Sequence, residues 1–306
     1  MSAEKLSTMI WDELPFSKEF IFDLNKDFSN LINNLTEVQK KLLIESPNEF
    51  NINVSYNWLN ELHLKLKASP GFVLIKTGDI YTDEELRCIY ALYCRSLGLL
   101  NNLYGYFYDV IDQGLDYTKK AIPVSMTSAS TGYHTDSTAK EYLPDIVGLL
   151  CLYPGAVGGD SLLTNAANLY NHLYQNFLNE FKTMQNPIIR DVITPGTTNS
   201  VEKIIENAFP IFSFPNEGFT FRYMRFWIES AYQKTGQIMP EELIQGLNET
   251  DRFFSSSQNH LQFRLERGDI LLLNNRFICH NRTAFENNTA SFDNHRRLVR
   301  SWINYQ

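Results

Sequence analysis

The chain has 306 residues, a formal net charge of −8 and 43% hydrophobic residues. This content is enough for a sizeable core, and the diffuse acidic balance argues against nucleic acid or an anionic membrane as a partner. No stretch approaches the ~18 apolar residues of a membrane span, and the acidic start lacks the apolar core of a signal peptide. We therefore expect a soluble cytoplasmic protein whose four scattered cysteines are reduced.

Helical signals dominate residues 1–70, which we predict to form a mainly helical N-terminal cover. Apolar residues recur at spacings of three and four in residues 24–46 and 56–69, the pattern of an amphipathic helix. Residues 70–78 are a short apolar run between turn signals, which predicts a strand.

After this strand the pattern changes from helices to many short strands. Thr82 stands three residues before Glu85, and this capping box predicts a helix over residues 82–100. Further helices are predicted over residues 165–181 and 240–254. Strand signals broken by Gly, Pro and Asn cover residues 104–112, 121–129, 145–154, 159–166, 218–228, 261–275, 276–285 and 296–305.

The order of these elements indicates the fold class. Helices come first and short strands later, without regular strand–helix alternation, which indicates an α+β fold with an antiparallel sandwich or jelly roll. We predict a single domain over residues 1–306, in which residues 71–306 form the β core and about 210–260 form a helical insert.

The stretch GYHTDSTA carries the first chemical signal. On an extended segment, His134 and Asp136 project to the same face, because side chains alternate with a period of two. An imidazole and a carboxylate on one face supply two ligands of a divalent metal, so a third must come from elsewhere. His280 is the favoured candidate, because it follows an apolar strand and sits near the predicted strand end.

Two histidines and one carboxylate leave three coordination positions open. This arrangement suits non-haem Fe(II), which activates O₂ beside a bound co-substrate. Further along, Arg296 and Arg300 are four residues apart in RRLVR, so they share a face of a strand while Arg297 points away. Two inward guanidinium groups require acidic partners, and a dicarboxylate co-substrate with an acidic substrate supplies them.

These pieces together carry a family resemblance. GYHTD, GGDSLLTNA, RGDILLLNNRFICHNRTAF and RRLVR resemble, in order and approximate spacing, the Fe(II)/2-oxoglutarate oxygenases of the taurine dioxygenase and clavaminate synthase-like superfamily. The resemblance covers residues 70–306. The tail HNRTAF leans toward the clavaminate synthase-like branch, which includes hydroxylases of free arginine, asparagine and lysine.

The resemblance implies a fold and a set of roles. The core would be a double-stranded β-helix, a cupin-like jelly roll, with iron on His134, Asp136 and His280. Ser161, where the family often has Thr, and Arg296 would hold 2-oxoglutarate. Arg300 would hold the acidic group of the substrate, and the two arginines could exchange roles. The clavaminate synthase-like branch often has Glu in place of Asp136, so the subfamily stays open.

Three further residues are candidate substrate contacts. Arg222 and Arg225 face opposite ways if their segment is a strand, and we assign Arg225 to the pocket. Ser125 and Thr127 are two apart on the predicted strand that enters GYHTD, so both could line the same pocket.

The predicted function is hydroxylation of a free amino acid or a small amino-acid-derived acid, with 2-oxoglutarate and O₂ converted to succinate and CO₂. Desaturation, epoxidation and cyclisation remain open, because they share the cofactor chemistry. Asp136 favours these oxidations over halogenation, since related halogenases have Gly or Ala there. Two other classes also remain: a non-catalytic metal-binding jelly roll, and a zinc hydrolase that uses the same ligands.

Overall fold

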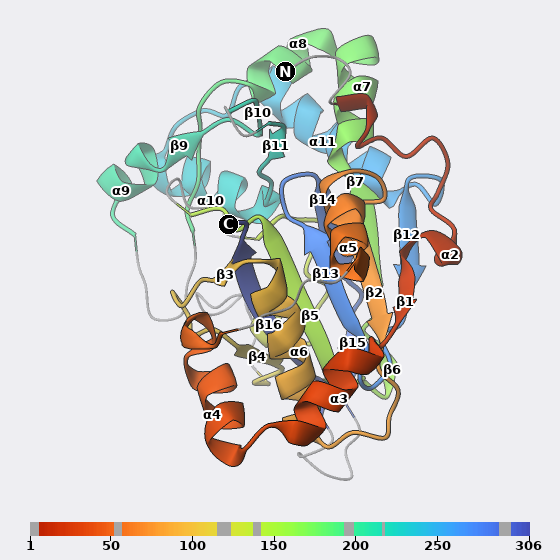
Figure 1. The fold of residues 1–306 in the computed structure, drawn as a ribbon. Coiled ribbons are helices and arrows are strands. Elements are labelled where there is room, and N and C mark those ends of the chain that lie inside the picture. Colours follow the sequence, from red (N-terminus) through yellow and green to blue (C-terminus); the bar gives the residue numbers. More distant parts are fainter. Residues whose placement is uncertain are drawn as a thin grey trace.

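The computed structural model describes most of the chain as one α+β fold. The described residues are 6–51, 57–114, 124–136, 142–192, 199–215, 218–287 and 295–306. A large sheet runs through the molecule, with the helices of residues 26–45 at one end and the helices of residues 166–255 at the other (Figure 1). The α+β class predicted from the order of elements is confirmed.

The large sheet has seven strands in the order β1-β2-β13-β5-β16-β3, and β4 also pairs with β16. All neighbours are antiparallel except β1 and β2. The strands are β1 Ile21–Asp23, β2 Phe72–Lys76, β3 Leu99–Leu100, β4 Tyr108–Ile111, β5 Ile146–Tyr153, β13 Ile270–Asn274 and β16 Arg297–Asn304.

A second, three-stranded antiparallel sheet has the order β12-β7-β14. Its strands are β12 His260–Phe263, β7 Ser161–Asn165 and β14 Ile278–Arg282. Three short pairs complete the β structure: β6 Val157–Gly158 with β15 Phe285–Glu286, β8 Ile188–Ile189 with β9 Ala208–Phe209, and β10 Phe212–Ser213 with β11 Thr220–Phe221.

The central strands of the large sheet are buried on both faces. Along β13, Leu271 and Leu273 belong to one apolar cluster, which also contains Leu163 of β7. The alternate residues Ile270 and Leu272 belong to a second cluster with helix α6, Asp83–Leu97. This two-sided burial explains why the strand is an unbroken apolar run and not an alternating one.

The N-terminal helices pack against the large sheet. They are α2 Ser17–Phe20, α3 Lys26–Asn34, α4 Glu37–Glu45, the 3₁₀ turn η1 Pro47–Glu49, α5 Asn57–Lys67 and α6 Asp83–Leu97. Helices α3 to α6 lie on the face of the second apolar cluster, and α2 lies, through Phe20, on the face of the first. The helix predicted over residues 82–100 is confirmed as α6. Thr82 accepts a hydrogen bond from the Glu85 amide, and the Glu85 carboxylate accepts one from the Thr82 amide.

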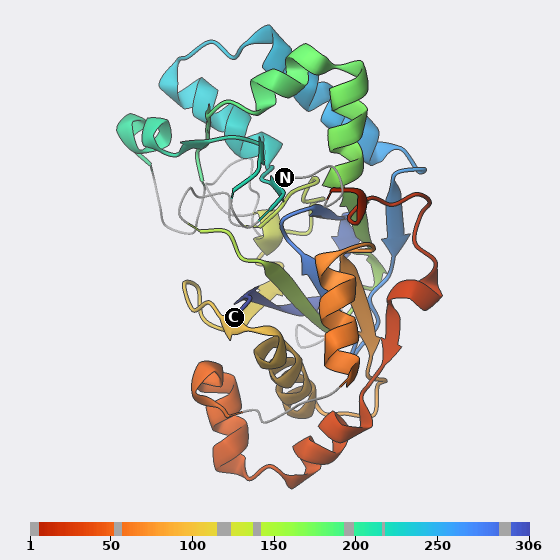
Figure 2. The same cartoon turned by 45° about the horizontal axis from the view of Figure 1, so that its top comes forward.

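The later helices gather at the opposite end of the molecule (Figure 2). They are α7 Ala166–Asn176, α8 Leu178–Met184, α9 Val201–Glu206, α10 Arg225–Thr235 and α11 Glu241–Ser255. The helices predicted over residues 165–181 and 240–254 are confirmed as α7 with α8 and as α11. No helix among the described residues is long and apolar enough to cross a lipid bilayer.

Two strand predictions were wrong. Residues 218–228 form only the short strand β11 before helix α10 begins at Arg225. The physical reason is burial: Ile228 and Ala231, three residues apart, both pack inward, which is the spacing of a helix. In the segment 121–129, residues Val124–Met126 form the 3₁₀ turn η2, while residues 121–123 lie outside the described part of the chain.

Candidate active site

A single β-bridge brings the first two predicted ligands to the third. The amide of His134 donates to the carbonyl of His280, and the His280 amide donates to the His134 carbonyl, each at 3.0 Å. The GYHTD segment therefore forms isolated bridges at His134, to His280 of β14 and to Met224. The ligand atoms of His134, Asp136 and His280 all lie within 4.8 Å of one another.

The spacing of these atoms fits a divalent metal. Nε2 of His134 and Nε2 of His280 each lie 3.5 Å from Oδ1 of Asp136. Two ligand atoms on an ion with bonds of about 2.1 Å are separated by about 3.0–3.4 Å when the angle between them is octahedral to tetrahedral. A slight closure of the three side chains would thus seat an ion.

The Asp136 carboxylate is divided between two tasks. Oδ1 faces the imidazoles, whereas Oδ2 accepts hydrogen bonds from Nε1 of Trp302 at 2.7 Å and from Nη1 of Arg300 at 3.2 Å. Burial by itself would raise the pKa of Asp136, but the Arg300 guanidinium and the two imidazoles hold it well below its ordinary value. The carboxyl group is therefore ionised, as a metal ligand must be.

The Asp136 backbone is fixed by one buried side chain. The amide of Asp136 donates to Oδ1 of Asn275 at 2.8 Å, and Nδ2 of Asn275 donates to the carbonyls of Asp136 and Pro144. Asn275 lies just after β13, at the turn that leads into β14 and its ligand His280. The same turn therefore positions ligands from two distant parts of the sequence.

Both histidines present Nε2 toward Oδ1 of Asp136. Nδ1 of His134 lies 2.9 Å from the carbonyl oxygen of Gly132, so Nδ1 carries the proton and donates it. Burial, together with the nearby His134 and Arg300 and against the opposing effect of Asp136, lowers the pKa of His280 to about 3. His280 is consequently a neutral imidazole over the physiological range.

The structure places the two predicted arginines on one face of the large sheet. Arg300 lies beside Asp136, while Arg296, 3% exposed, donates from Nη2 to the Gly159 carbonyl at 3.3 Å. Arg297 lies over the ring of Tyr153, on the face toward the second apolar cluster. The alternation predicted from RRLVR is thus confirmed, although a bulge separates Arg297 from Leu298.

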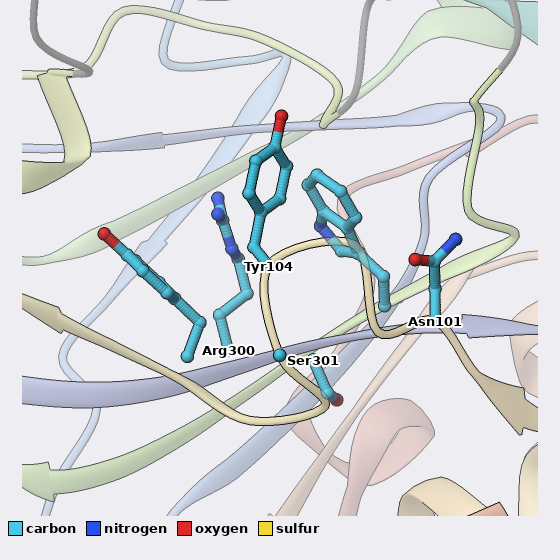
Figure 3. Close-up of a pocket in the computed structure, with 7 residues that line it drawn as sticks. Asn101, Tyr104, Arg300 and Ser301 are labelled. Carbon is cyan, nitrogen blue, oxygen red and sulfur yellow. The ribbon is translucent and has the colours of Figure 1, made fainter. Parts of the chain in front are cut away.

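Arg300 stands in a cleft with aromatic walls (Figure 3). Its guanidinium carbon lies 5.4 Å from the ring centre of Tyr108 and 5.0 Å from that of Trp302. Asn101, Tyr104, Gly105 and Ser301 complete the lining. The side chain of Arg300 is 19% exposed, so a ligand that enters this cleft could reach it.

Ser161 and a further arginine extend the site on the smaller sheet. Ser161 opens β7 and pairs across the strands with Arg282 of β14, two residues after His280. Cross-strand partners and i, i+2 neighbours share a face, so all three side chains project to the same side of this sheet. Burial, with the nearby Arg296, lowers the pKa of Arg282 to about 9.

Arg282, Trp302 and Asn275 were not identified from the sequence. Arg282 had a usable signal, since it stands two residues after the predicted ligand His280 on the same predicted strand. Trp302 had a similar signal, two residues after Arg300. Asn275 had none, because a loop asparagine does not indicate which backbone groups it will bind.

The remaining predicted contacts lie on other elements, and only Thr127 touches a residue already described. Arg225 begins helix α10, where its guanidinium donates to Glu229, Asp251 and Asn248. The structure does not bring it to the three ligands, because the expected strand is a helix. Ser125 lies in the 3₁₀ turn η2, and the buried Thr127 accepts a hydrogen bond at its carbonyl from Arg282.

The arrangement of two histidines and one carboxylate with open positions defines a mononuclear metal site of the kind used by non-haem iron enzymes. The chain belongs to the taurine catabolism dioxygenase TauD, TfdA family, which it matches over residues 34–302. The predicted resemblance to this superfamily of dioxygenases is thereby confirmed.

Two curated relatives illustrate the similarity. FR-33289 synthase of Streptomyces rubellomurinus is 30% identical over 192 residues, which cover 61% of this chain and 53% of that protein. Human gamma-butyrobetaine dioxygenase is 23% identical over 170 residues, which cover 54% of this chain and 43% of that protein. The chain thus spans about half the length of the curated relatives it matches.

Solved structures share the fold over nearly the whole chain. Asparagine oxygenase in complex with Fe(II), 2S,3S-3-hydroxyasparagine and succinate has a TM-score of 0.62 at 15% identity, with 93% of both chains covered. The non-heme iron oxygenase OrfP in complex with Fe and alpha-ketoglutaric acid has a TM-score of 0.61 at 11% identity, with 94% of both chains covered. At these identities the likeness extends to the fold alone.

Proposed function

We propose that this chain is an Fe(II)/2-oxoglutarate-dependent oxygenase that oxidises a C–H bond of an amino acid or a small amino-acid-derived acid. The observation that carries the proposal is the Asp136 carboxylate, whose Oδ1 faces two imidazole nitrogens while Oδ2 is held by the protein. We also interpret the large sheet and the β12-β7-β14 sheet as the two halves of a double-stranded β-helix.

His134, Asp136 and His280 would hold the iron. When bound, Fe(II) supplies oxygen activation, which couples the conversion of 2-oxoglutarate to succinate and CO₂ with oxidation of the substrate. The chain's own contribution is placement and charge. Neutral His280 and ionised Asp136 are both in the protonation states that metal binding requires.

Arg296 and Ser161 would hold 2-oxoglutarate. Arg296 is nearly inaccessible, and burial lowers its pKa to about 10. Arg282 adds a second buried positive charge close by, and both guanidinium groups flank the ring of Phe285. A carboxylate of the co-substrate would offset these charges and match a guanidinium through two hydrogen bonds.

Arg300 would hold the acidic group of the substrate. Nη1 is occupied by Asp136, while Nε and Nη2 make no hydrogen bond with any residue that the structure describes. The free edge therefore suits a carboxylate within the cleft of Tyr104 and Tyr108. Solved structures of the same fold contain hydroxyasparagine or hydroxyarginine, which supports an amino acid as the substrate class.

We expect the reaction to take place in a reducing, cytoplasmic environment. Cys88, Cys94, Cys151 and Cys279 are all free and buried, which is usual for proteins of such compartments. Small acidic molecules, and not nucleic acid, are the proposed partners.

Succinate formation tests the proposal. The protein is reconstituted with Fe(II) without oxygen and then supplied with 2-oxoglutarate, O₂ and a panel of free L-amino acids. Succinate that rises with one amino acid, together with a product that has gained one oxygen atom, would support amino-acid hydroxylation. A product that has lost two hydrogens would indicate desaturation or cyclisation instead.

The controls separate the competing classes. Asp136→Ala should abolish succinate formation, whereas Asp79→Ala, at an exposed position, should leave it unchanged. Cleavage products without succinate from zinc-loaded protein would support a hydrolase. No succinate from folded, iron-loaded protein under any condition would refute the proposed activity and favour a non-catalytic metal-binding protein.

A further inference from the structure

A tryptophan holds the metal-facing carboxylate in this site. Trp302 is 9% exposed, and its indole N–H donates to Oδ2 of Asp136 at 2.7 Å. This bond is shorter than the 3.2 Å bond from Arg300 to the same oxygen. Oδ1, which faces both imidazoles, receives no hydrogen bond from the indole, so the two carboxylate oxygens have different surroundings.

We propose that Trp302 is a positioning residue that restricts Asp136 to coordination through Oδ1 alone. An ionised carboxylate with two free oxygens coordinates a metal through one or both. Chelation through both oxygens would occupy a coordination position that the co-substrate and O₂ require. By binding Oδ2, the indole keeps that position open. The inference rests on the metal site proposed above and assigns it a residue outside the three ligands.

Trp302 is better placed than Arg300 for a constant restraint. The indole is uncharged and lies on β16, which is hydrogen-bonded to β5 with Trp302 opposite Val147. Arg300 stands in the open cleft and has a free edge, so an acidic ligand would compete with Asp136 for its hydrogen bonds. Trp302 lines the same cleft, but its uncharged indole forms no ion pair with a carboxylate, so we expect its bond to Asp136 to persist when the cleft is filled.

The loop that follows β3 holds the indole in place. The amide of Asn101 donates to the backbone carbonyl of Trp302 at 2.8 Å, which fixes this loop to β16. Tyr104, on the same loop, packs edge-on against the indole, with ring centres 5.4 Å apart (Figure 3). The orientation of the N–H is therefore set by packing and by a backbone bond, as precise ligand support requires.

Trp302→Phe removes the N–H and retains an aromatic ring, so it tests the inference directly. The readout is Co(II) binding to the metal-free protein. The affinity is measured by titration and the coordination by the visible ligand-field spectrum, and neither measurement requires turnover. We expect Co(II) affinity to fall by about 10–100-fold, the usual effect of removing a partner of a metal ligand. We also expect a spectrum changed toward higher coordination, since Asp136 becomes free to chelate.

A matched control isolates the N–H. Trp58→Phe changes a tryptophan that packs against Phe28 and Tyr93 in the other apolar cluster. This variant should bind Co(II) as the wild-type protein does. Equal affinity and an unchanged spectrum in Trp302→Phe would overturn the inference, whereas a wild-type protein that binds no metal would overturn the proposed function itself.

If Trp302→Phe does not fold, the wild-type protein provides the test. The four tryptophan indole N–H signals are recorded by ¹⁵N NMR, and Trp302 is assigned by replacing the other three with Phe, one at a time. Addition of Zn(II) should shift the Trp302 signal more than the other three, and its hydrogen exchange should be slow. An unshifted, rapidly exchanging Trp302 signal on metal binding would overturn the inference.

Discussion

Asn275→Ala should destabilise the protein and loosen its metal site together. The side chain is fully buried and makes three hydrogen bonds, two to the backbone of Asp136 and one to the carbonyl of Pro144. Each such bond contributes about 1 kcal/mol net, and a buried group left without a partner costs about 1–3 kcal/mol. The free energy of unfolding should therefore fall by about 3 kcal/mol.

The assay is thermal unfolding of the metal-free protein, followed by Co(II) titration. For a chain of this size about 3 kcal/mol corresponds to a fall in Tm of about 6 °C. Co(II) affinity should fall as well, because Asp136 is no longer fixed. Asn34→Ala is the matched control, since that exposed side chain donates to the Asn30 carbonyl of its own helix. A change in Tm no larger than in the control would refute the reasoning.

Three further predictions address the co-substrate pocket, pH and metal binding. In Gly159→Ala the new Cβ would lie 2.8 Å from Nε of Arg296, so the KM for 2-oxoglutarate should rise about tenfold. Gly236→Ala is the control, because Gly236 also has a positive φ but has open space around it, and this variant should leave the KM unchanged. Burial, with the nearby Lys67, lowers the pKa of His63. Near and below pH 6.5 the folded state therefore binds fewer protons than the unfolded state, and the free energy of unfolding should fall as pH drops below about 6.5. His63→Gln should weaken this dependence in unfolding experiments at pH 7.5 and 5.5, and an identical dependence would contradict the assignment. Co(II) at a hundredfold excess over its Kd should raise the free energy of unfolding of the wild-type protein by about 2.7 kcal/mol. Co(II) should not raise the free energy of unfolding of Asp136→Ala.

Local patterns in the sequence were enough for several elements and for the metal ligands. The capping box at Thr82 predicted the start of α6, because its two hydrogen bonds join residues three apart. The two-residue spacing of His134 and Asp136 predicted a shared face, and the apolar strand before His280 indicated the third ligand. These features depend on short-range geometry, which the order of residues expresses directly.

Local patterns failed where burial overrode them. The alternation in residues 218–228 resembles a strand, but the inward packing of Ile228 and Ala231 favours helix α10. Arg225 was consequently assigned to the pocket on the assumption of a strand. Its guanidinium instead donates to Glu229 of α10 and Asp251 of α11. A short segment with mixed signals adopts the structure that its neighbours stabilise.

The sequence by itself determined which residues are the candidate metal ligands, because HTD and the later histidine are local motifs in a fixed order. Only the tertiary structure decided how those ligands are held. The bond from Trp302 to Asp136 joins residues 166 apart, and the bonds from Asn275 to Asp136 join residues 139 apart. Such contacts arise when β16 and the β13–β14 turn are brought to the GYHTD segment by burial of two apolar clusters. Packing is a property of the whole chain, so no spacing within one segment encodes it.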